Sequence, residues 1–196
     1  MHRAGRRTGW ASVVALLLLV AATFVSPAAQ ADAPASDEKT AAFEVEFMTD
    51  MIDHHQMAVM MAETCTEKAV HEELAAMCEQ IIAVQTQEIE MMQTWLQDWY
   101  GVEHEPMMTS GMMRSMEHLQ RLEGADYEIA FMRSMTRHHW GAIREAETCL
   151  DRAEHEELLS LCEDIKAAQL EEIAQMQEWL ADWYGITSGR PVDTDA

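Results

Sequence analysis

Two segments of this chain, residues 47–102 and 131–186, are copies of one another. They align without a gap, and about 30 of the 56 aligned positions are identical. Both copies begin with Phe-Met-x-x-Met-x-x-His-His and have Asp-Trp-Tyr-Gly just before their last residue. A repeat of this kind indicates one structural unit used twice. Any fold proposed for the chain must therefore pair two similar units.

Each copy has the periodicity of two amphipathic helices. Apolar residues recur at intervals of three and four, as they do in a helix that buries one face. The predicted helices span about 41–69, 71–100, 125–149 or slightly beyond, and 155–184. Gly101 and Gly185 follow the second helix of each copy, where glycine commonly ends a helix. Two such hairpins bury their apolar faces best against each other, which predicts an all-α four-helix bundle.

The first 31 residues have the features of a secretory signal peptide. Three arginines precede an apolar stretch at 13–25, and Ala-Gln-Ala ends at residue 31. We therefore expect an exported protein, periplasmic or extracellular, with no membrane attachment after cleavage. The remaining expected segments are a disordered leader at 32–40, repeat 1 at 41–102, a Met-rich linker at 103–124, repeat 2 at 125–186, and a flexible tail at 187–196. The linker is expected to hold a short helix near 112–122.

The charge of the chain limits its partners. The part after residue 31 carries all 35 acidic residues and ten of the thirteen basic ones, a formal net charge of about −25. Such a chain repels nucleic acid and anionic lipid, so neither is expected as a partner. It is compatible with attraction of cations, although an acidic surface also serves solubility alone. Methionine is the other unusual component, with 17 residues.

The four cysteines suggest how each hairpin is aligned. Each copy holds two, Cys65 with Cys78 and Cys149 with Cys162. In an exported protein the favoured interpretation is one disulfide within each hairpin, although free thiolate ligands or bridges between the hairpins are alternatives.

This alignment predicts which residues of the two helices face each other. If Cys65 faces Cys78, His55 faces Glu88 and Met51 faces Met92. We call this set of two methionines, one histidine and one glutamate a box, and the second copy repeats it. His54 lies at the edge of the first box and His138 at the edge of the second. The candidate metal ligands are Met51, His54, His55, Glu88 and Met92, and Met135, His138, His139, Glu172 and Met176.

The box combines ligands that a soft metal ion prefers. Thioethers favour Cu(I), with Ag(I) as its analogue, and imidazole also suits copper. The alternative interpretation is that these residues are purely structural, with methionine filling the core and each His–Glu pair stabilising the fold. Burying a carboxylate is costly, however, and the same set occurs twice. We therefore favour metal binding.

Further methionines lie outside the box. Met57, Met60 and Met61 fall away from the predicted core face and are expected on the surface. The linker methionines form either a flap over the bundle or a second Cu(I) site. Candidates for a second site are Met48, Met108, Met112 and Met116.

The motifs resemble a family of exported bacterial proteins known as domain of unknown function 305. The resemblance covers about residues 41–186 and rests on the Met-x-x-His-His pattern together with Gln-x-x-Glu-Ile-x-x-Met-x-x-Trp at 85–95 and 169–179. It implies a ferritin-like four-helix bundle and, for some members, periplasmic copper binding through Met and His. Repeat 2 departs from repeat 1 at Thr136 and Arg137, which puts its site in doubt.

Three functions follow as hypotheses. The favoured one is an exported copper-binding protein that sequesters Cu(I) or hands it to a copper-handling partner protein, and it is not an enzyme. The alternative is a structural or protein-interaction bundle without metal. A metal-dependent oxidoreductase is the least favoured.

Overall fold

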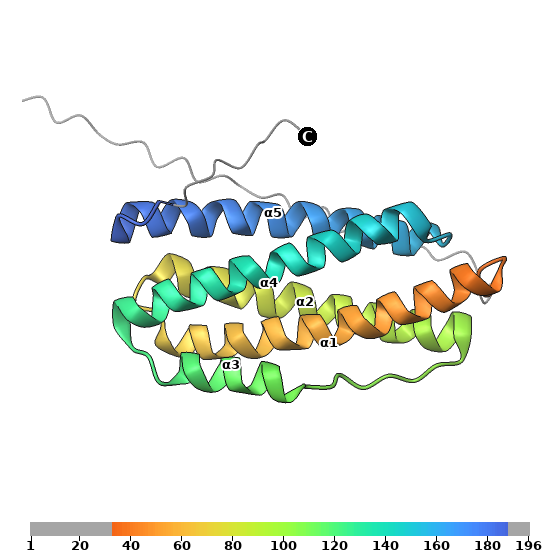
Figure 1. Ribbon diagram of the computed structural model, residues 1–196, viewed down its shortest axis with the longest axis horizontal. Helices are drawn as coiled ribbons and strands as arrows, with labels where there is room; N and C mark the ends of the chain where they lie inside the picture. The colour runs from red at the N-terminus through yellow and green to blue at the C-terminus, as the bar shows by residue number, and fades with distance from the viewer. Residues whose placement is uncertain (1–32, 188–196) are drawn as a thin grey trace, which may run out of the picture. The chain divides into compact units, whose positions relative to one another are not determined.

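The computed structural model describes residues 33–187, and this part consists of five α-helices without a strand (Figure 1). The helices are α1 (Glu38–Lys68), α2 (Glu72–Tyr100), α3 (Ser110–Gln120), α4 (Gly124–Arg152) and α5 (Glu156–Tyr184). The predicted all-α fold is confirmed. No helix in this range is long and apolar enough to cross a bilayer. The predicted signal peptide at 1–31 and residues 188–196 of the predicted tail lie outside the described residues.

The helix ends follow local chemistry. Asp37 caps α1, because its carboxylate accepts hydrogen bonds from the backbone N–H groups of Lys39 and Thr40. The helix therefore begins at Glu38, and residues 38–40, which the sequence analysis placed in a disordered leader, belong to α1. Gly101 and Gly185 end α2 and α5 in the left-handed conformation, with φ of 64° and 65°.

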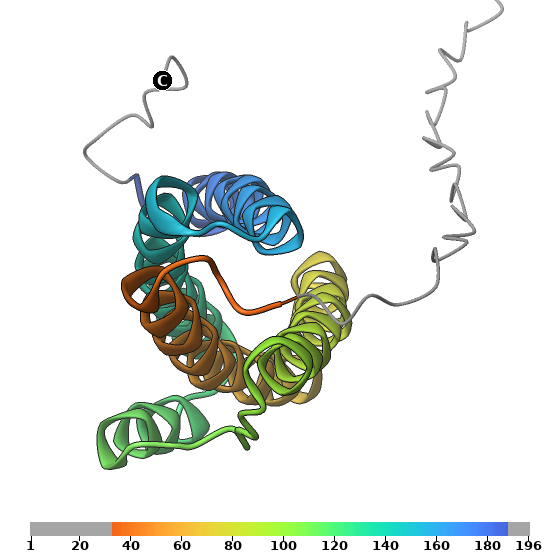
Figure 2. The ribbon, with the colours of Figure 1, turned by 90° about the vertical axis from the view of Figure 1, so that its right-hand side faces the viewer.

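The four long helices form two hairpins that pack through α1 and α4. Helix α1 pairs with α2 and α4 pairs with α5, as predicted, and α1 lies against α4 (Figure 2). A disulfide joins Cys65 to Cys78 in the first hairpin, and another joins Cys149 to Cys162 in the second. The predicted pairing within each hairpin is confirmed. These bridges fix the alignment of the facing helices.

The apolar core consists of two separate clusters. The first combines the first half of α1 and the second half of α2 with the second half of α4 and the first half of α5. The second cluster uses the other half of each long helix, together with α3. Between the two clusters each long helix carries polar residues, which we call the polar band: His54, His55, Gln85, Glu88, His138, His139, Gln169 and Glu172.

Helix α3 covers the outer side of α1 and α4 (Figure 2). Met116 and Leu119 of α3 are buried in the second core cluster, where Met61 is only 1% exposed. The expected exposure of Met57, Met60 and Met61 is therefore wrong for Met61, and Met57 and Met60 are half-buried against the same cluster. The apolar periodicity of α1 indicates which face packs on the other long helices, but it does not indicate that α3 covers a further face.

A buried carboxylate of α1 fastens the turn of the second hairpin. Glu44 accepts hydrogen bonds from the backbone N–H groups of Glu154 at 2.6 Å and His155 at 3.2 Å. It also pairs with the His155 ring at 2.5 Å and accepts the Tyr100 hydroxyl at 2.6 Å. Trp99 stacks on the His155 ring at 3.9 Å between centroids. We call this arrangement the α1 clasp.

The duplicated counterpart fastens the first hairpin to α4. Glu128 accepts the backbone N–H groups of Val70 and His71, pairs with the His71 ring at 2.7 Å, and accepts the Tyr184 hydroxyl. Trp183 stacks on the His71 ring at 3.8 Å. This α4 clasp and the α1 clasp tie each hairpin turn to the first helix of the other hairpin. They hold the two hairpins in one alignment, and they thereby determine which side chains of the two hairpins meet in the polar band.

Candidate metal centre

A histidine and a glutamate face each other in each hairpin, as the cysteine alignment predicts. In the first hairpin His55 Nε2 lies 2.8 Å from Glu88 Oε2, in hydrogen-bond geometry. In the second, His139 Nε2 lies 2.6 Å from Glu172 Oε2, but the angles do not suit a hydrogen bond and both atoms are unpartnered. Both histidines are fully buried, whereas the glutamate side chains are 11% and 22% exposed.

The second pair of histidines meets across the interface between the hairpins. His54 of α1 and His138 of α4 stack with 3.6 Å between ring centroids. Gly141 of α4 makes room for this contact, because a Cβ there would lie 3.1 Å from His54 Nε2. From the sequence, His54 and His138 are predicted only at the edges of separate boxes. Their contact depends on how α1 crosses α4, which the pattern of one hairpin does not determine.

Most of the buried imidazole nitrogens in the polar band have no hydrogen-bond partner. These are Nδ1 of His54 and His55 and both ring nitrogens of His138 and His139. Buried polar atoms are nearly always paired, so several orphans at one level of a bundle require an explanation. Burial, followed by the neighbouring rings of His55 and His139, lowers the pKa of His54 to about 3. Burial also holds the pKa of His138 well below 6.5, with His54 as the next cause.

Thioethers flank this band on both sides. Met51 and Met92 are fully buried in the first core cluster, and Met135 and Met176 are fully buried in the second. In each hairpin one of these methionines lies one helical turn before the histidine, and the other lies one turn after the glutamate. The candidate second site is not assembled, because Met48 and Met116 belong to different core clusters. Met112 and Met116 belong to α3, whereas Met108 precedes the helix.

The donor set decides which metal ions the centre fits. Within residues 33–187, no three His, Cys, Asp or Glu residues lie close enough together to hold an ion by themselves. The cysteines are in disulfides and supply no thiolate. Beside the orphan nitrogens lie thioethers, one carboxylate per hairpin, and the unpartnered amide oxygens of Gln85 and Gln169. Imidazole with thioether suits a soft ion such as Cu(I), whereas Ca²⁺ and Mg²⁺ prefer a shell made of oxygen ligands.

Several solved structures of other proteins are similar to this chain. The chain is similar to CopM in its Cu(I)-bound form, with 32% identity over 72% of this chain and 98% of that one, and a TM-score of 0.66. CopM in a silver-bound form matches with 33% identity, the same two coverages and a TM-score of 0.65.

The crystal structure of a DUF305 protein from Streptomyces coelicolor is similar at 27% identity, over 76% of this chain and 96% of that one, with a TM-score of 0.65. No curated protein sequence matches the chain. The family model described as domain of unknown function (DUF305) matches residues 44–180 and, in a second match, 128–194. The chain therefore belongs to the DUF305 family.

Proposed function

We propose that this protein is an exported copper-binding protein that holds Cu(I) in the polar band and sequesters it or passes it to a copper-handling protein. Its role is binding rather than catalysis, and Ag(I) is a usable analogue. The observation that carries the proposal is the set of orphan imidazole nitrogens at the centre of the bundle, bordered by buried thioethers. The similarity to a protein whose structures contain Cu(I), Cu(II) and silver supports the same function.

The chief ligands in the first hairpin are Met51, His55 and Met92. His54 can add an imidazole from the interface between the hairpins. Glu88 contacts His55 Nε2, so it either ligates the ion or orients the ring as a hydrogen-bond acceptor. The counterparts in the second hairpin are Met135, His139, Met176, His138 and Glu172. A soft ion is favoured because four of these ten residues are methionines.

An anaerobic Cu(I) titration of the mature protein against a coloured competing chelator tests the proposal. The informative variant replaces Met51 and Met135 with leucine, which keeps the buried volume nearly constant and removes one thioether from each box. We expect its Cu(I) affinity to fall by about two orders of magnitude, the effect of about 2.7 kcal/mol of lost binding energy.

The chain offers a matched control for this experiment. Met48 and Met132 are also fully buried and lie one helical turn before Met51 and Met135. Replacing both with leucine should leave Cu(I) affinity unchanged. Equal affinities of the two double variants would refute the ligand assignment. A wild-type protein that leaves all copper on the chelator would refute the function itself.

A structural bundle without metal is the second candidate. It is favoured by the complete hydrogen bond between His55 and Glu88, which forms without any ion. In that case His55→Ala should cost about 3 kcal/mol of folding stability, because the buried Glu88 loses its partner, and the wild type should bind no Cu(I) tightly. Measuring unfolding and Cu(I) affinity on the same variant separates the two candidates.

A further inference from the structure

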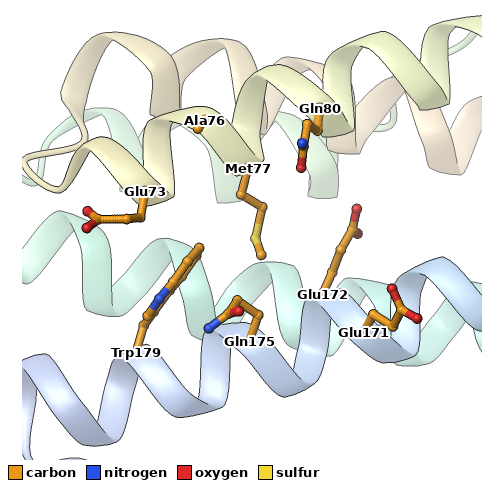
Figure 3. Close-up of a pocket in the computed structure, with 8 residues that line it drawn as sticks. All are labelled: Glu73, Ala76, Met77, Gln80, Glu171, Glu172, Gln175 and Trp179. Atoms are coloured by element: carbon orange, nitrogen blue, oxygen red, sulfur yellow. The ribbon is translucent and has the colours of Figure 1, made fainter. Parts of the chain in front are cut away.

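A pocket of about 330 Å³ opens between α2 and α5. Figure 3 shows Glu172 and Trp179 projecting from α5 toward α2, while Met77 projects from α2 toward α5. Three of its eight lining residues are glutamates, and none is basic. The pocket therefore combines carboxylates, one thioether and one indole ring, which are groups that attract a soft cation.

One of these glutamates connects the pocket with the polar band. Glu172 lines the pocket, and its Oε2 atom is also 2.6 Å from the buried Nε2 atom of His139. His139 is fully buried, and neither of its ring nitrogens has a hydrogen-bond partner. An orphan imidazole thus lies directly behind a carboxylate that reaches the pocket. Glu172 alone therefore joins the pocket to His139.

The internal duplication shows which pocket residues are particular to this side of the molecule. The counterpart of Met77 in the other copy is Leu161, and the counterpart of Glu171 is Gln87. Trp179 and Glu172 correspond to Trp95 and Glu88, so these two are common to both copies. The Glu88 side chain is also half as exposed as that of Glu172, at 11% against 22%. The counterpart face also holds a thioether and a third carboxylate, because Met91 corresponds to Gln175 and Asp164 to Gln80. The α2–α5 pocket is therefore distinguished by the place of its thioether, at Met77, and by the greater exposure of Glu172.

We propose that the α2–α5 pocket is the entry site through which a soft monovalent cation, Cu(I) or its analogue Ag(I), reaches His139. The Met77 thioether and the Glu172 carboxylate are transient ligands there, and Glu172 then passes the ion to the imidazole. This inference rests on the proposed function, because it assumes that the polar band is the destination. It adds a site and a direction of loading that the ligand assignment does not contain.

The chemistry of the pocket suits a transient site better than a storage site. Glu73, Glu171 and Glu172 create a negative field that raises the local concentration of cations and the rate of their arrival. The face of Trp179 attracts a desolvated cation without binding it firmly. One thioether and one carboxylate are too few ligands to retain the ion against the imidazoles and thioethers of the interior. The ion is therefore expected to move inward.

The kinetics of Ag(I) uptake test this route. Met77→Leu introduces the residue that the duplicated copy already has at position 161, so the fold should tolerate it. Mixing the mature disulfide-bonded protein with silver nitrate in chloride-free buffer in a stopped-flow instrument gives the uptake rate. We expect about tenfold slower uptake, equivalent to about 1.4 kcal/mol in the activation barrier, with unchanged Ag(I) stoichiometry at equilibrium.

Met91→Leu is the matched control, because Met91 is also on α2 but does not line the pocket. Its uptake rate should equal that of the wild type. A second measurement uses wild-type protein labelled with ¹³C at the methionine methyl groups. The Met77 signal, identified by its loss in Met77→Leu, should shift once silver is added beyond the amount that fills the interior sites, because excess ion then occupies the pocket.

The outcomes separate this inference from the proposed function. Tight Ag(I) binding by the wild type, with equal uptake rates for Met77→Leu and Met91→Leu and no shift of the Met77 signal, overturns the entry route and leaves the copper site intact. Absence of tight binding by the wild type overturns both. Slow uptake confined to Met77→Leu, with a shifting Met77 signal, establishes the route.

Discussion

We expect Glu44→Gln to destabilise the fold more than the corresponding acid-to-amide substitution at any other acidic residue of α1. The substitution keeps the shape of the side chain but turns one carboxylate oxygen into an NH₂ group. One oxygen of Glu44 accepts two backbone N–H groups at 2.6 and 3.2 Å, and a glutamine carbonyl can keep both bonds. The other oxygen contacts the Tyr100 hydroxyl and the His155 ring.

The magnitude follows from those last two contacts. Hydrogen bonds to a charged group contribute about 1.5–3 kcal/mol each, and an amide NH₂ cannot accept either donor. The Tyr100 hydroxyl can rotate to accept instead, which recovers part of the loss. We therefore expect a decrease of about 3 kcal/mol in the free energy of unfolding, which is a large fraction of the 5–15 kcal/mol typical of a domain.

Urea unfolding followed by far-ultraviolet circular dichroism, with both disulfides intact, measures this decrease. Glu46→Gln is the control, because Glu46 is on the same helix but is exposed. It should change the free energy of unfolding by less than about 0.5 kcal/mol. An equally small effect of Glu44→Gln would refute the conclusion that the α1 clasp holds the two hairpins together.

The same clasp predicts how stability depends on pH. Burial alone raises the pKa of Glu44, but hydrogen bonds from Tyr100, Glu154 and His155 outweigh burial and hold that pKa below its ordinary value of 4.5. A carboxyl whose pKa is lower in the folded state stabilises the fold above pH 4.5, and this contribution is lost as the pH falls through the folded pKa. Glu44→Gln should therefore lose more stability at pH 7 than at pH 3, and a pH-independent loss would contradict the argument.

Three further predictions concern the backbone and the covalent frame. Replacing Cys65 and Cys78 together with alanine removes a disulfide with a sequence separation of 13 and should cost about 3 kcal/mol, measured by urea unfolding against the disulfide-bonded wild type. Gly141→Ala places a Cβ 3.1 Å from His54 Nε2, so it should cost about 1 kcal/mol of folding stability. The same displacement of His54 should weaken Cu(I) binding, and an unchanged Cu(I) affinity would exclude His54 as a ligand. Gly101→Ala should cost about 1 kcal/mol in thermal unfolding because its φ is 64°, with no effect on Cu(I) affinity.

The sequence predicted the alignment within each hairpin but not the contact between hairpins. The cysteines place His55 opposite Glu88, because a disulfide fixes the alignment of two facing helices, and the structure has this pair at 2.8 Å. The stack of His54 on His138 depends on how α1 crosses α4. No periodicity within one hairpin contains that information. A signal was nevertheless present, since Gly141 replaces a methionine of the first copy at the contact.

The clasps were also missed, although the sequence contains their components twice. Glu44 and Glu128 are counterparts, as are His71 and His155. Sequence reasoning treated both histidines as ordinary residues at the start of a helix. Their partners are more than 50 positions away in the chain, on the other hairpin. A search for acidic residues that occupy equivalent positions on the apolar faces of both copies would have found Glu44 and Glu128.

The division of the core into two clusters has a consequence for how the chain folds and how it arose. Each cluster takes one half of every long helix, so neither hairpin contains a complete core of its own. A single copy expressed alone would leave two half-cores exposed and would gain stability by associating with a second copy about a twofold axis. The present chain has the architecture of such a dimer joined by its linker. Its two hairpins should therefore unfold in one cooperative transition rather than as independent modules.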